Sequence, residues 1–290
     1  MHRSRSLPHL LLAAVVIVWG GSFAAIKALV DHGLDAPDVA IGRYLIAAPG
    51  FAVALVMAGG LPGLTRRDAL RVVAAGLFVV TVYHLALNAG ERTTTAGTAS
   101  VVIAGAPAMA LTMSLALGLE GFSRRRAAGL AVAFAGVVVV ILLGSGQSVS
   151  VSTSKGPLLV LIAAASFAAY NVLAKPLLGR YDAIAVSSAA SLVGTVALLP
   201  FATSGTAGRL TGMSGGDLLL VLYLGLVCTL AGYVLWTVGL RGLDPSRAVA
   251  YLYGVPVVAV AVGALTLGES VTAWLLVGGV LVVGGVALAQ

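Results

Sequence analysis

The sequence predicts an all-α integral membrane protein in which ten transmembrane helices form two inverted five-helix repeats. Three observations support this fold class. The mean hydropathy is +1.07 and only 9% of the 290 residues are charged, which no soluble globular domain approaches. Apolar runs of membrane-spanning length recur along the chain. The second half of the sequence also matches the first half at a constant shift.

Each expected helix is an apolar run of about 20 residues, the length that crosses the hydrocarbon core. The first run follows Arg3 and Arg5, as in a secretory signal, but it continues past Trp19 without a clear cleavage site. We therefore expect it to remain as a helix. Glycine-rich and proline-containing junctions separate several of the runs. The ten expected spans are Leu10–Val30, Val39–Ala58, Ala69–Gly90, Ala96–Leu119, Ala127–Leu143, Gly156–Leu178, Ile184–Phe201, Leu218–Leu240, Ala248–Leu267 and Thr272–Gln290.

The internal match indicates a duplication. At a shift of 149 residues, Arg92 falls on Arg241, Pro107 on Pro256 and Glu120 on Glu269, pairings that an apolar composition does not explain. This predicts a first repeat at 10–143, a Ser-rich linker at 144–155 and a second repeat at 156–290. Because each repeat has five spans, an odd number, the second copy must enter the membrane from the opposite face. Inverted repeats of this kind are typical of secondary transporters.

The charge distribution predicts the orientation. If the N-terminus is cytoplasmic, 12 of the 17 Lys and Arg residues fall in cytoplasmic segments and only three fall outside. This bias follows the positive-inside rule, so we expect both termini in the cytoplasm of a cell whose inner, or plasma, membrane holds the protein. The net charge of +7 is therefore assigned to membrane orientation, and no nucleic-acid partner is expected.

Two motifs carry a resemblance to a known family. The segment 19–27, Trp-Gly-Gly-Ser-Phe-Ala-Ala-Ile-Lys, resembles the opening of an EamA domain, and 268–286 resembles its close. The resemblance covers both halves, as in the drug/metabolite transporter superfamily. It implies ten-helix carriers, many of which export amino acids and related metabolites. Phe167 stands where the second domain of this family often has Trp, a departure that bears on the pocket rather than on the fold.

Polar and aromatic side chains within the spans are the candidate substrate contacts, because at that depth they need a partner or a wet cavity. Aromatic faces with hydrogen-bonding groups suit a zwitterion that carries a sizeable apolar side chain. Interface anchoring is the alternative for the aromatic residues, and an interhelical hydrogen bond is the alternative for the histidine. The candidates are Trp19, Tyr83, His84, Asn88, Ser100, Tyr170, Tyr233, Trp236 and Tyr253.

Two further groups of residues have predicted roles. Lys27 and Arg43 lie toward the outer face and could form a cationic outer vestibule for a substrate carboxylate; the alternative is that they extend to the surface and do nothing more. Gly105 with Pro107, and Gly254 with Pro256, fall at matching positions within the fourth and ninth spans. We interpret them as hinges for alternating access, with a static kink as the alternative.

The acidic residues bear on energy coupling. All ten fall at span ends or in loops, so we expect no buried carboxylate that could serve a proton relay. We therefore expect facilitated movement, with His84 as the one candidate proton carrier. Glu120 and Glu269 each precede a candidate N-cap, Ser123 or Thr272, where a carboxylate favours the helix dipole.

The expected function is export of amino acids, large or aromatic ones included, and of related small metabolites by alternating access. The alternatives are a sugar-phosphate, nucleotide-sugar or drug transporter of the same superfamily and, from a different class, a channel or a membrane scaffold. The chain has no HExxH or GxSxG motif, so no enzyme is expected. We expect no cofactor and no metal site. The expected partners are a small-molecule substrate and the lipid bilayer, and the oligomeric state is left open.

Overall fold

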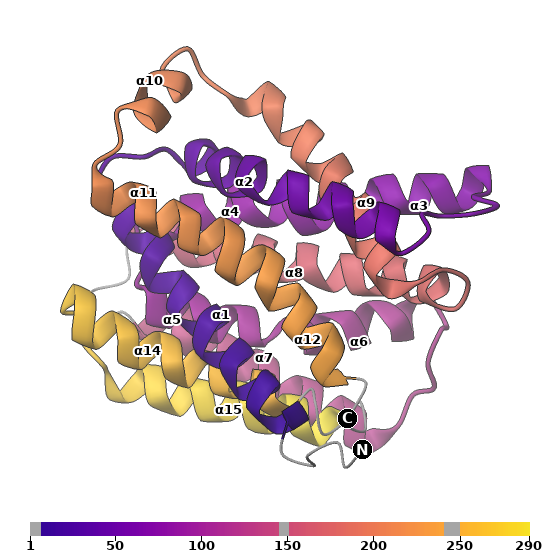
Figure 1. The fold of residues 1–290 in the computed structure, drawn as a ribbon. Coiled ribbons are helices and arrows are strands. Elements are labelled where there is room, and N and C mark those ends of the chain that lie inside the picture. The colour runs from indigo at the N-terminus through magenta and orange to yellow at the C-terminus, as the bar shows by residue number, and fades with distance from the viewer. Residues whose placement is uncertain (1–6, 145–150, 241–249) are drawn as a thin grey trace.

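A computed structural model describes residues 7–144, 151–240 and 250–290, and within those ranges the chain forms helices and no strands (Figure 1). Nine helical segments of this part of the chain are long and apolar enough to cross a membrane, and α15 (Ala273–Ala289) is a shorter apolar helix of 17 residues. The unbroken spans are α1 (Leu7–Asp31), α2 (Ala36–Met57), α7 (Arg124–Leu143), α8 (Val151–Leu178) and α9 (Ala183–Leu198).

Two spans contain a π-helix in their middle. The third consists of α3 (Arg66–Gly76), η1 (Leu77–Val82) and α4 (Tyr83–Glu91). The eighth consists of α11 (Gly215–Leu222), η3 (Tyr223–Ala231) and α12 (Gly232–Leu240). The shift of 149 places Leu77 on Leu226, within η3, so the two π-helices lie at corresponding positions. Such segments are rare and are frequently found at functional sites.

The fourth and ninth spans are interrupted at the predicted Gly-x-Pro positions. The fourth is divided at Gly105 into α5 (Ala96–Ala104) and α6 (Ala106–Ala116). In the ninth, a turn at Tyr253 precedes α14 (Gly254–Leu267). Pro107 lies two residues after the first break and Pro256 three residues after the second. Proline has no N–H to donate to the preceding turn, so the α-helical hydrogen bonding cannot continue across it. The interruptions are present where they are expected; motion about them stays a prediction.

Hydroxyl-bearing caps fix the start of five helices. The side chains of Thr65, Thr95, Ser123, Ser214 and Thr272 each accept a hydrogen bond from the backbone N–H three residues further along. This satisfies an N–H that the first helical turn otherwise leaves without a partner. The N-cap roles expected for Ser123 and Thr272 are therefore confirmed.

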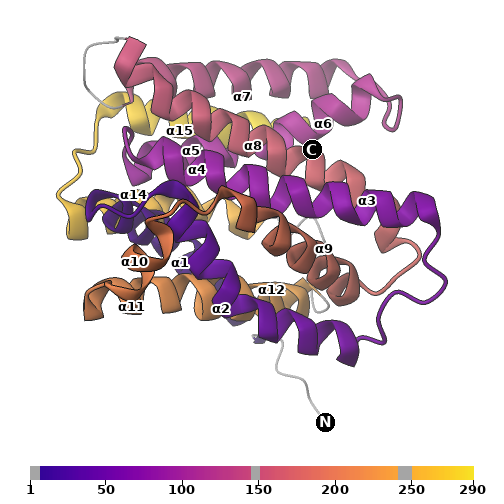
Figure 2. The same cartoon turned by 90° about the horizontal axis from the view of Figure 1, so that it is seen from above.

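The helices cross a common bundle, and their connections gather at its two ends (Figures 1 and 2). One end holds the connections at 58–65, 117–123 and 179–182, together with the start of α1 and the end of α15. The opposite end holds the connections at 32–35, 92–95, 202–214 and 268–272. We name these the termini end and, after the predicted orientation, the outer end.

Glycines bring α7 and α15 into backbone contact. A Cβ added at Gly285 would lie 2.3 Å from the backbone nitrogen of Ala133, and one added at Gly136 would lie 2.6 Å from that of Val282. Only glycine permits so close an approach of two helices. Gly129, Gly136, Gly278 and Gly285 therefore allow tight packing of α7 against α15, whereas a Cβ at Gly284 would meet no atom within 4 Å.

The helix boundaries differ from the predicted ones in two places. Helix α8 begins at Val151, inside the predicted linker at 144–155, whose residues 145–150 lie outside the described part. A short helix, α10 (Thr206–Thr211), lies in the connection between α9 and α11 and was not expected. Both are polar stretches, in which hydropathy does not distinguish a helix from a loop. The division of the chain into two repeats stays a prediction.

Candidate functional site

A cavity of about 160 Å³ lies in the middle of the bundle. It is enclosed by α1, α2, η1, α4, α5, α6, α8, η3, α12 and the ninth span, so both halves of the chain contribute to its wall. The lining is mainly apolar, and seven aromatic side chains dominate it: Trp19, Phe23, Tyr44, Tyr83, Phe167, Tyr233 and Tyr253. A pocket of this composition with a few polar groups is the usual form of a small-molecule site.

The aromatic rings contact one another across the two halves. Trp19 lies 6.1 Å from Tyr233 and 5.8 Å from Trp236 between ring centroids, and Tyr83 lies 5.8 Å from Phe167. The Trp19 indole Nε1 donates a 2.9 Å hydrogen bond to the carbonyl of Cys228 in η3. This bond fixes the ring orientation and leaves the ring as an apolar wall.

The charged group of the cavity is Arg43, on α2. Its side chain is buried, at 8% exposure, and its Nε donates a 2.5 Å hydrogen bond to Oγ1 of Thr229. The Thr229 hydroxyl in turn donates to the carbonyl of Leu224, within η3, at 2.7 Å. Among the described residues, Arg43 forms no ion pair with a carboxylate. A buried guanidinium without an anion is costly, which favours an anionic guest.

His84 belongs to the same wall. Its Nε2 is 2.9 Å from the Tyr44 hydroxyl, and its ring packs edge to face against Tyr44 and Tyr83, with centroids 5.0 Å and 4.8 Å away. Its Nδ1 is buried and has no hydrogen-bond partner within the described residues. The imidazole is therefore oriented by one interhelical hydrogen bond, and its second nitrogen remains available.

A second, larger cavity of about 650 Å³ continues toward the termini end. It shares Trp19, Pro107, Phe167, Tyr233 and Leu252 with the first cavity. Apolar side chains line much of the rest, together with aromatic, polar and charged ones: Tyr170, Asn171, Trp236, Glu120, Arg126, Lys175 and Ser187. Glu120 lies 3.4 Å from both Arg126 and Lys175 at this mouth, and Lys175 is 64% exposed. The central cavity therefore leads to the surface at the termini end.

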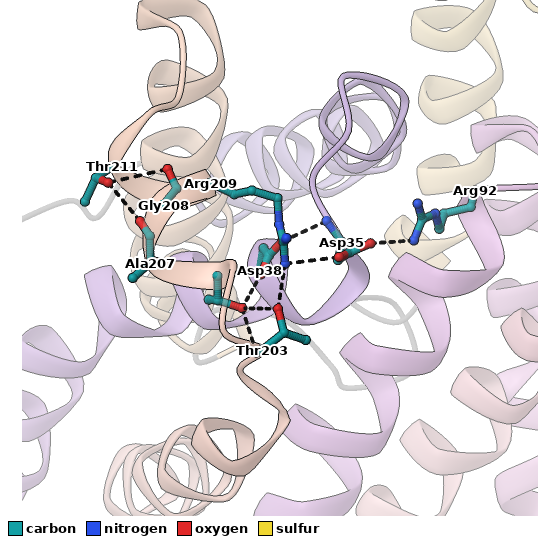
Figure 3. A network of polar contacts seen from close by, with 9 residues as sticks. Asp35, Asp38, Arg92, Thr203, Ala207, Gly208, Arg209 and Thr211 are labelled. Atoms are coloured by element: carbon teal, nitrogen blue, oxygen red, sulfur yellow. Dashed lines mark hydrogen bonds and ion pairs between the residues drawn. The ribbon is translucent and has the colours of Figure 1, made fainter.

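Ion pairs join the two halves at the outer end (Figure 3). Asp38 is fully buried and accepts hydrogen bonds from Nε and Nη2 of Arg209 on α10 and a 2.7 Å bond from Thr206. Asp35 receives Arg209 at 3.0 Å and Arg92 at 2.8 Å. The hydrogen bond to Asp38 raises the pKa of Arg209 above its usual value. We call these five residues the outer network.

A further pair lies beside the outer network. Nδ1 of His32 is 2.6 Å from a carboxylate oxygen of Asp217, at the start of α11. This contact connects the first turn of α11 with the residue that follows α1. The outer end is thus held by contacts between charged groups of the two halves.

The structure brings together most of the predicted substrate contacts. Trp19, Tyr83, His84, Ser100, Tyr233 and Tyr253 line the central cavity, and Tyr170 and Trp236 line the larger one. Asn88 lines neither; its amide donates a 3.0 Å hydrogen bond to the carbonyl of Ala36. Pro107 and Pro256 line the central cavity, whereas Gly105 and Gly254 do not. A role in binding stays a prediction for all of them.

The two predicted vestibule cations are separated. Lys27 forms an ion pair with Asp31 one turn further along α1, at 2.7 Å, and lines neither cavity. Arg43 lines the central cavity instead of lying at the outer surface. The prediction missed Tyr44, although it is adjacent to Arg43, and did not select Phe167, which the repeat pairs with Trp19.

The expectation that no carboxylate is buried is wrong. Asp38, Asp68 and Glu91 are fully buried and Asp217 is 8% exposed. A position at the end of a span does not determine exposure, because neighbouring helices and connections cover these ends. Glu269 also differs from its expected role: it accepts hydrogen bonds from the backbone N–H groups of Ala96 and Gly97, at 2.7 Å and 3.2 Å. It therefore caps α5 and not its own following helix.

A helical bundle of membrane-spanning segments around an aromatic cavity that continues to one surface is typical of the class of membrane transporters. The chain belongs to the EamA-like transporter family, whose model matches residues 6–142 and 154–289. It is thus a transmembrane transporter, and its curated relatives are named as transporters rather than as enzymes.

Three relatives and one solved structure illustrate the likeness. An uncharacterized transporter of Archaeoglobus fulgidus is 33% identical over 280 residues, 96% of each chain. A probable terminal-alkyne amino-acid exporter of Streptantibioticus cattleyicolor is 33% identical, over 96% of this chain and 91% of that one. A probable amino-acid metabolite efflux pump of Salmonella typhimurium is 31% identical over 45% of this chain and 46% of the relative. A crystal structure with 20% identity has a TM-score of 0.63 over 99% of this chain and 97% of that one, and so shares the fold.

Proposed function

We propose that this chain is a carrier of ten transmembrane helices that exports amino acids with large apolar or aromatic side chains across the bacterial plasma membrane. The observation that carries the proposal is Arg43, a buried cation without a carboxylate partner in the described residues, in the wall of an aromatic cavity. Names of two relatives as an amino-acid exporter and an amino-acid metabolite efflux pump support the substrate class.

The lining of the cavity matches the parts of such a substrate. The guanidinium of Arg43 would receive the carboxylate through charge-assisted hydrogen bonds. The rings of Trp19, Tyr83 and Tyr233 offer faces and edges to a large side chain, and the same rings attract the ammonium group. A phosphate group could also bind Arg43. A phosphate dianion, however, carries two negative charges and would meet only the one arginine of this wall, whereas the single carboxylate of an amino acid carries one charge that Arg43 balances.

Repeated contacts support the inverted-repeat arrangement. A Cβ added at Gly90 would lie 2.7 Å from Val160 of α8, and one added at its repeat mate Gly239 would lie 2.7 Å from Leu12 of α1. Leu12 and Val160 are themselves paired at a shift of 148. The same contact between the halves is thus made twice, with the two halves exchanged, as a two-fold axis between them requires.

Alternating access follows from the same arrangement. The cavity continues to the termini end and the outer network holds the opposite end, which corresponds to an inward-open carrier if both termini are cytoplasmic. Exchange of the two arrangements would open the outer end and close the other. The interruptions at Gly105 and Tyr253 lie beside the cavity and provide positions at which the helices can bend.

The proposal is tested by flux from proteoliposomes loaded with a panel of labelled phenylalanine, tryptophan, leucine, glycine and a sugar phosphate. We expect efflux of the large apolar amino acids, and its loss in Arg43→Gln. Lys27→Gln is the matched control, since Lys27 lies on a neighbouring helix, lines neither cavity and is paired with Asp31. Flux confined to the phosphorylated compound, or full activity of Arg43→Gln, contradicts the proposal.

A further inference from the structure

Glu91 is a buried carboxyl group that the proposed function does not use. It is the last residue of α4, at the outer end, and its side chain has no exposed surface. Both carboxylate oxygens lack a hydrogen-bond partner in the described part of the chain, and no cation lies within ion-pair distance there. The other buried acids differ: Asp38 and Asp68 are paired with arginines, and Asp217 is paired with His32.

Other buried polar atoms near this end of α4 also lack a partner in the described part of the chain. Glu91 and Asn88 are one turn apart on α4, and the oxygen of the Asn88 amide is also buried and unpartnered. The hydroxyls of Thr94 and Thr98, just after α4 and in α5, are likewise unpartnered among the described residues. These atoms amount to three acceptor oxygens and two hydroxyl donors. None of the described residues donates a hydrogen bond that would stabilise a charged carboxylate at Glu91.

The charged groups that face Glu91 do not replace that proton. Glu269 faces it from the connection after α14, and its carboxylate already accepts the two backbone N–H groups of α5. Lys27 and Asp31 face it from α1 and are paired with each other. Arg43 faces it from α2 and is bonded to Thr229.

The other packed elements add no cation. Helix α5 has no ionisable residue, and α8 approaches this end of α4 through Gly156 and Val160. The adjacent Lys155 is exposed. Arg92, next to Glu91 in sequence, points to the surface and is bonded to Asp35 (Figure 3). A carboxylate in such surroundings is strongly disfavoured relative to the neutral acid.

We propose that Glu91 is a proton-binding site of the outer end: it holds a proton while the outer end is closed, as in this structure, and releases it to the external solution when that end opens. The step is a simple dissociation. The carboxylic acid loses H⁺ to external water and becomes a carboxylate that water then solvates. Because closing takes up one proton, external acid favours the closed outer end, and the ratio of closed to open molecules changes by up to about tenfold per pH unit.

This inference rests on the alternating access of the proposed function, but it concerns the gating of the carrier and not its substrate. It also replaces the earlier expectation that His84 is the one candidate proton carrier. His84 faces the cavity, more than one helical turn from Glu91 along α4, so the two groups can be tested separately.

The test measures the width of the outer end directly. Spin labels are placed at Thr93→Cys and Thr211→Cys, both exposed, in a Cys228→Ser background, and their distance distribution is recorded in liposomes from about pH 5 to pH 8. We expect the short distance to dominate in acid and the long distance to grow as the pH rises. Glu91→Gln, which mimics the protonated acid, is expected to keep the short distance at every pH. Asp31→Asn is the matched control and should keep the pH dependence.

A second measurement detects the proton on Glu91 itself and does not depend on the spin-label distances. The infrared spectrum of the wild-type protein should contain a carboxylic-acid C=O band that is absent from Glu91→Gln. An unchanged pH dependence in Glu91→Gln overturns the inference, as does the absence of the band. A distance distribution that follows Na⁺ concentration at fixed pH also overturns it, because the ligand would then be Na⁺. Amino-acid efflux without any pH-dependent opening would contradict this inference and leave the proposed function standing.

Discussion

Two adjacent glycines of α15 should respond to alanine with opposite signs. Gly285 faces α7, where a Cβ would lie 2.3 Å from the backbone nitrogen of Ala133 and 2.7 Å from the carbonyl oxygen of Gly129. Gly284 faces away and has no atom within 4 Å of the corresponding position. Real Cβ atoms do not approach backbone atoms so closely, so Gly285→Ala must push the two helices apart.

The magnitude follows from two opposing terms. Overpacking of a close contact costs about 1–3 kcal/mol, and the better helix propensity of alanine returns roughly 1 kcal/mol. We expect the free energy of unfolding to fall by up to about 2 kcal/mol in Gly285→Ala and to rise by up to about 1 kcal/mol in Gly284→Ala. The atoms nearest to a Cβ at Gly285 belong to the backbone of α7, so no flexible side chain can move away to make room for it.

The assay is reversible unfolding of the purified protein by SDS in mixed micelles, followed by far-ultraviolet circular dichroism. Efflux per folded molecule should be unchanged in both variants, because neither glycine lines a cavity. Equal shifts of the two variants, or stabilisation by Gly285→Ala, would refute the assignment of α7 and α15 as a tightly packed scaffold.

Four further predictions address the site and the outer end. Arg209→Gln should open the outer end more than Arg92→Gln, as measured by the two spin labels at fixed pH. Arg209 is bonded to the buried Asp38, while the exposed Arg92–Asp35 pair contributes at most about 1 kcal/mol. Equal effects of the two variants would contradict this prediction. The pKa of Arg209 is raised, so its charge persists below that value, and the difference between Arg209→Gln and the wild type should stay constant from about pH 5 to pH 8. Tyr44→Phe should lower the free energy of SDS unfolding by about 1–3 kcal/mol, since it leaves the buried His84 without its partner, and an unchanged value would show that another group takes its place. Trp19→Leu should weaken binding of aromatic amino acids relative to leucine by about 0.5–1.5 kcal/mol in calorimetric titrations, and an equal loss for both would argue against ring stacking.

Much of the fold could be predicted because a bilayer imposes strong rules on sequence. Apolar runs marked the helices, and the Gly-x-Pro motifs at 105–107 and 254–256 marked the interruptions in the fourth and ninth spans. The π-helices at 77–82 and 223–231 could not be read in the same way, because one extra residue in a turn leaves the hydropathy of a span unchanged. The start of α8 and the short helix α10 lie in polar segments, where apolar periodicity is absent.

The candidate site was predicted in its residue types more than in its geometry. Depth within a span identified Trp19, Tyr83 and Tyr233, which the structure places in one cavity. Depth did not reveal the direction of a long side chain, so Arg43 was assigned to the outer surface and lies in the cavity wall. It also did not reveal coverage by other helices, and Glu91 at the end of a span proved to be fully buried.

The most direct test of the account is the affinity of the purified carrier for L-phenylalanine compared with its amide, measured by calorimetry for the wild type and for Arg43→Gln. The two ligands differ in the carboxylate that Arg43 is proposed to receive. A hydrogen bond to a charged group contributes about 1.5–3 kcal/mol, so the wild type should bind the acid roughly tenfold to a hundredfold more tightly than the amide, and Arg43→Gln should bind both with similar affinity. Equal binding of the acid and the amide by the wild type, or an undiminished preference for the acid in Arg43→Gln, would contradict the account.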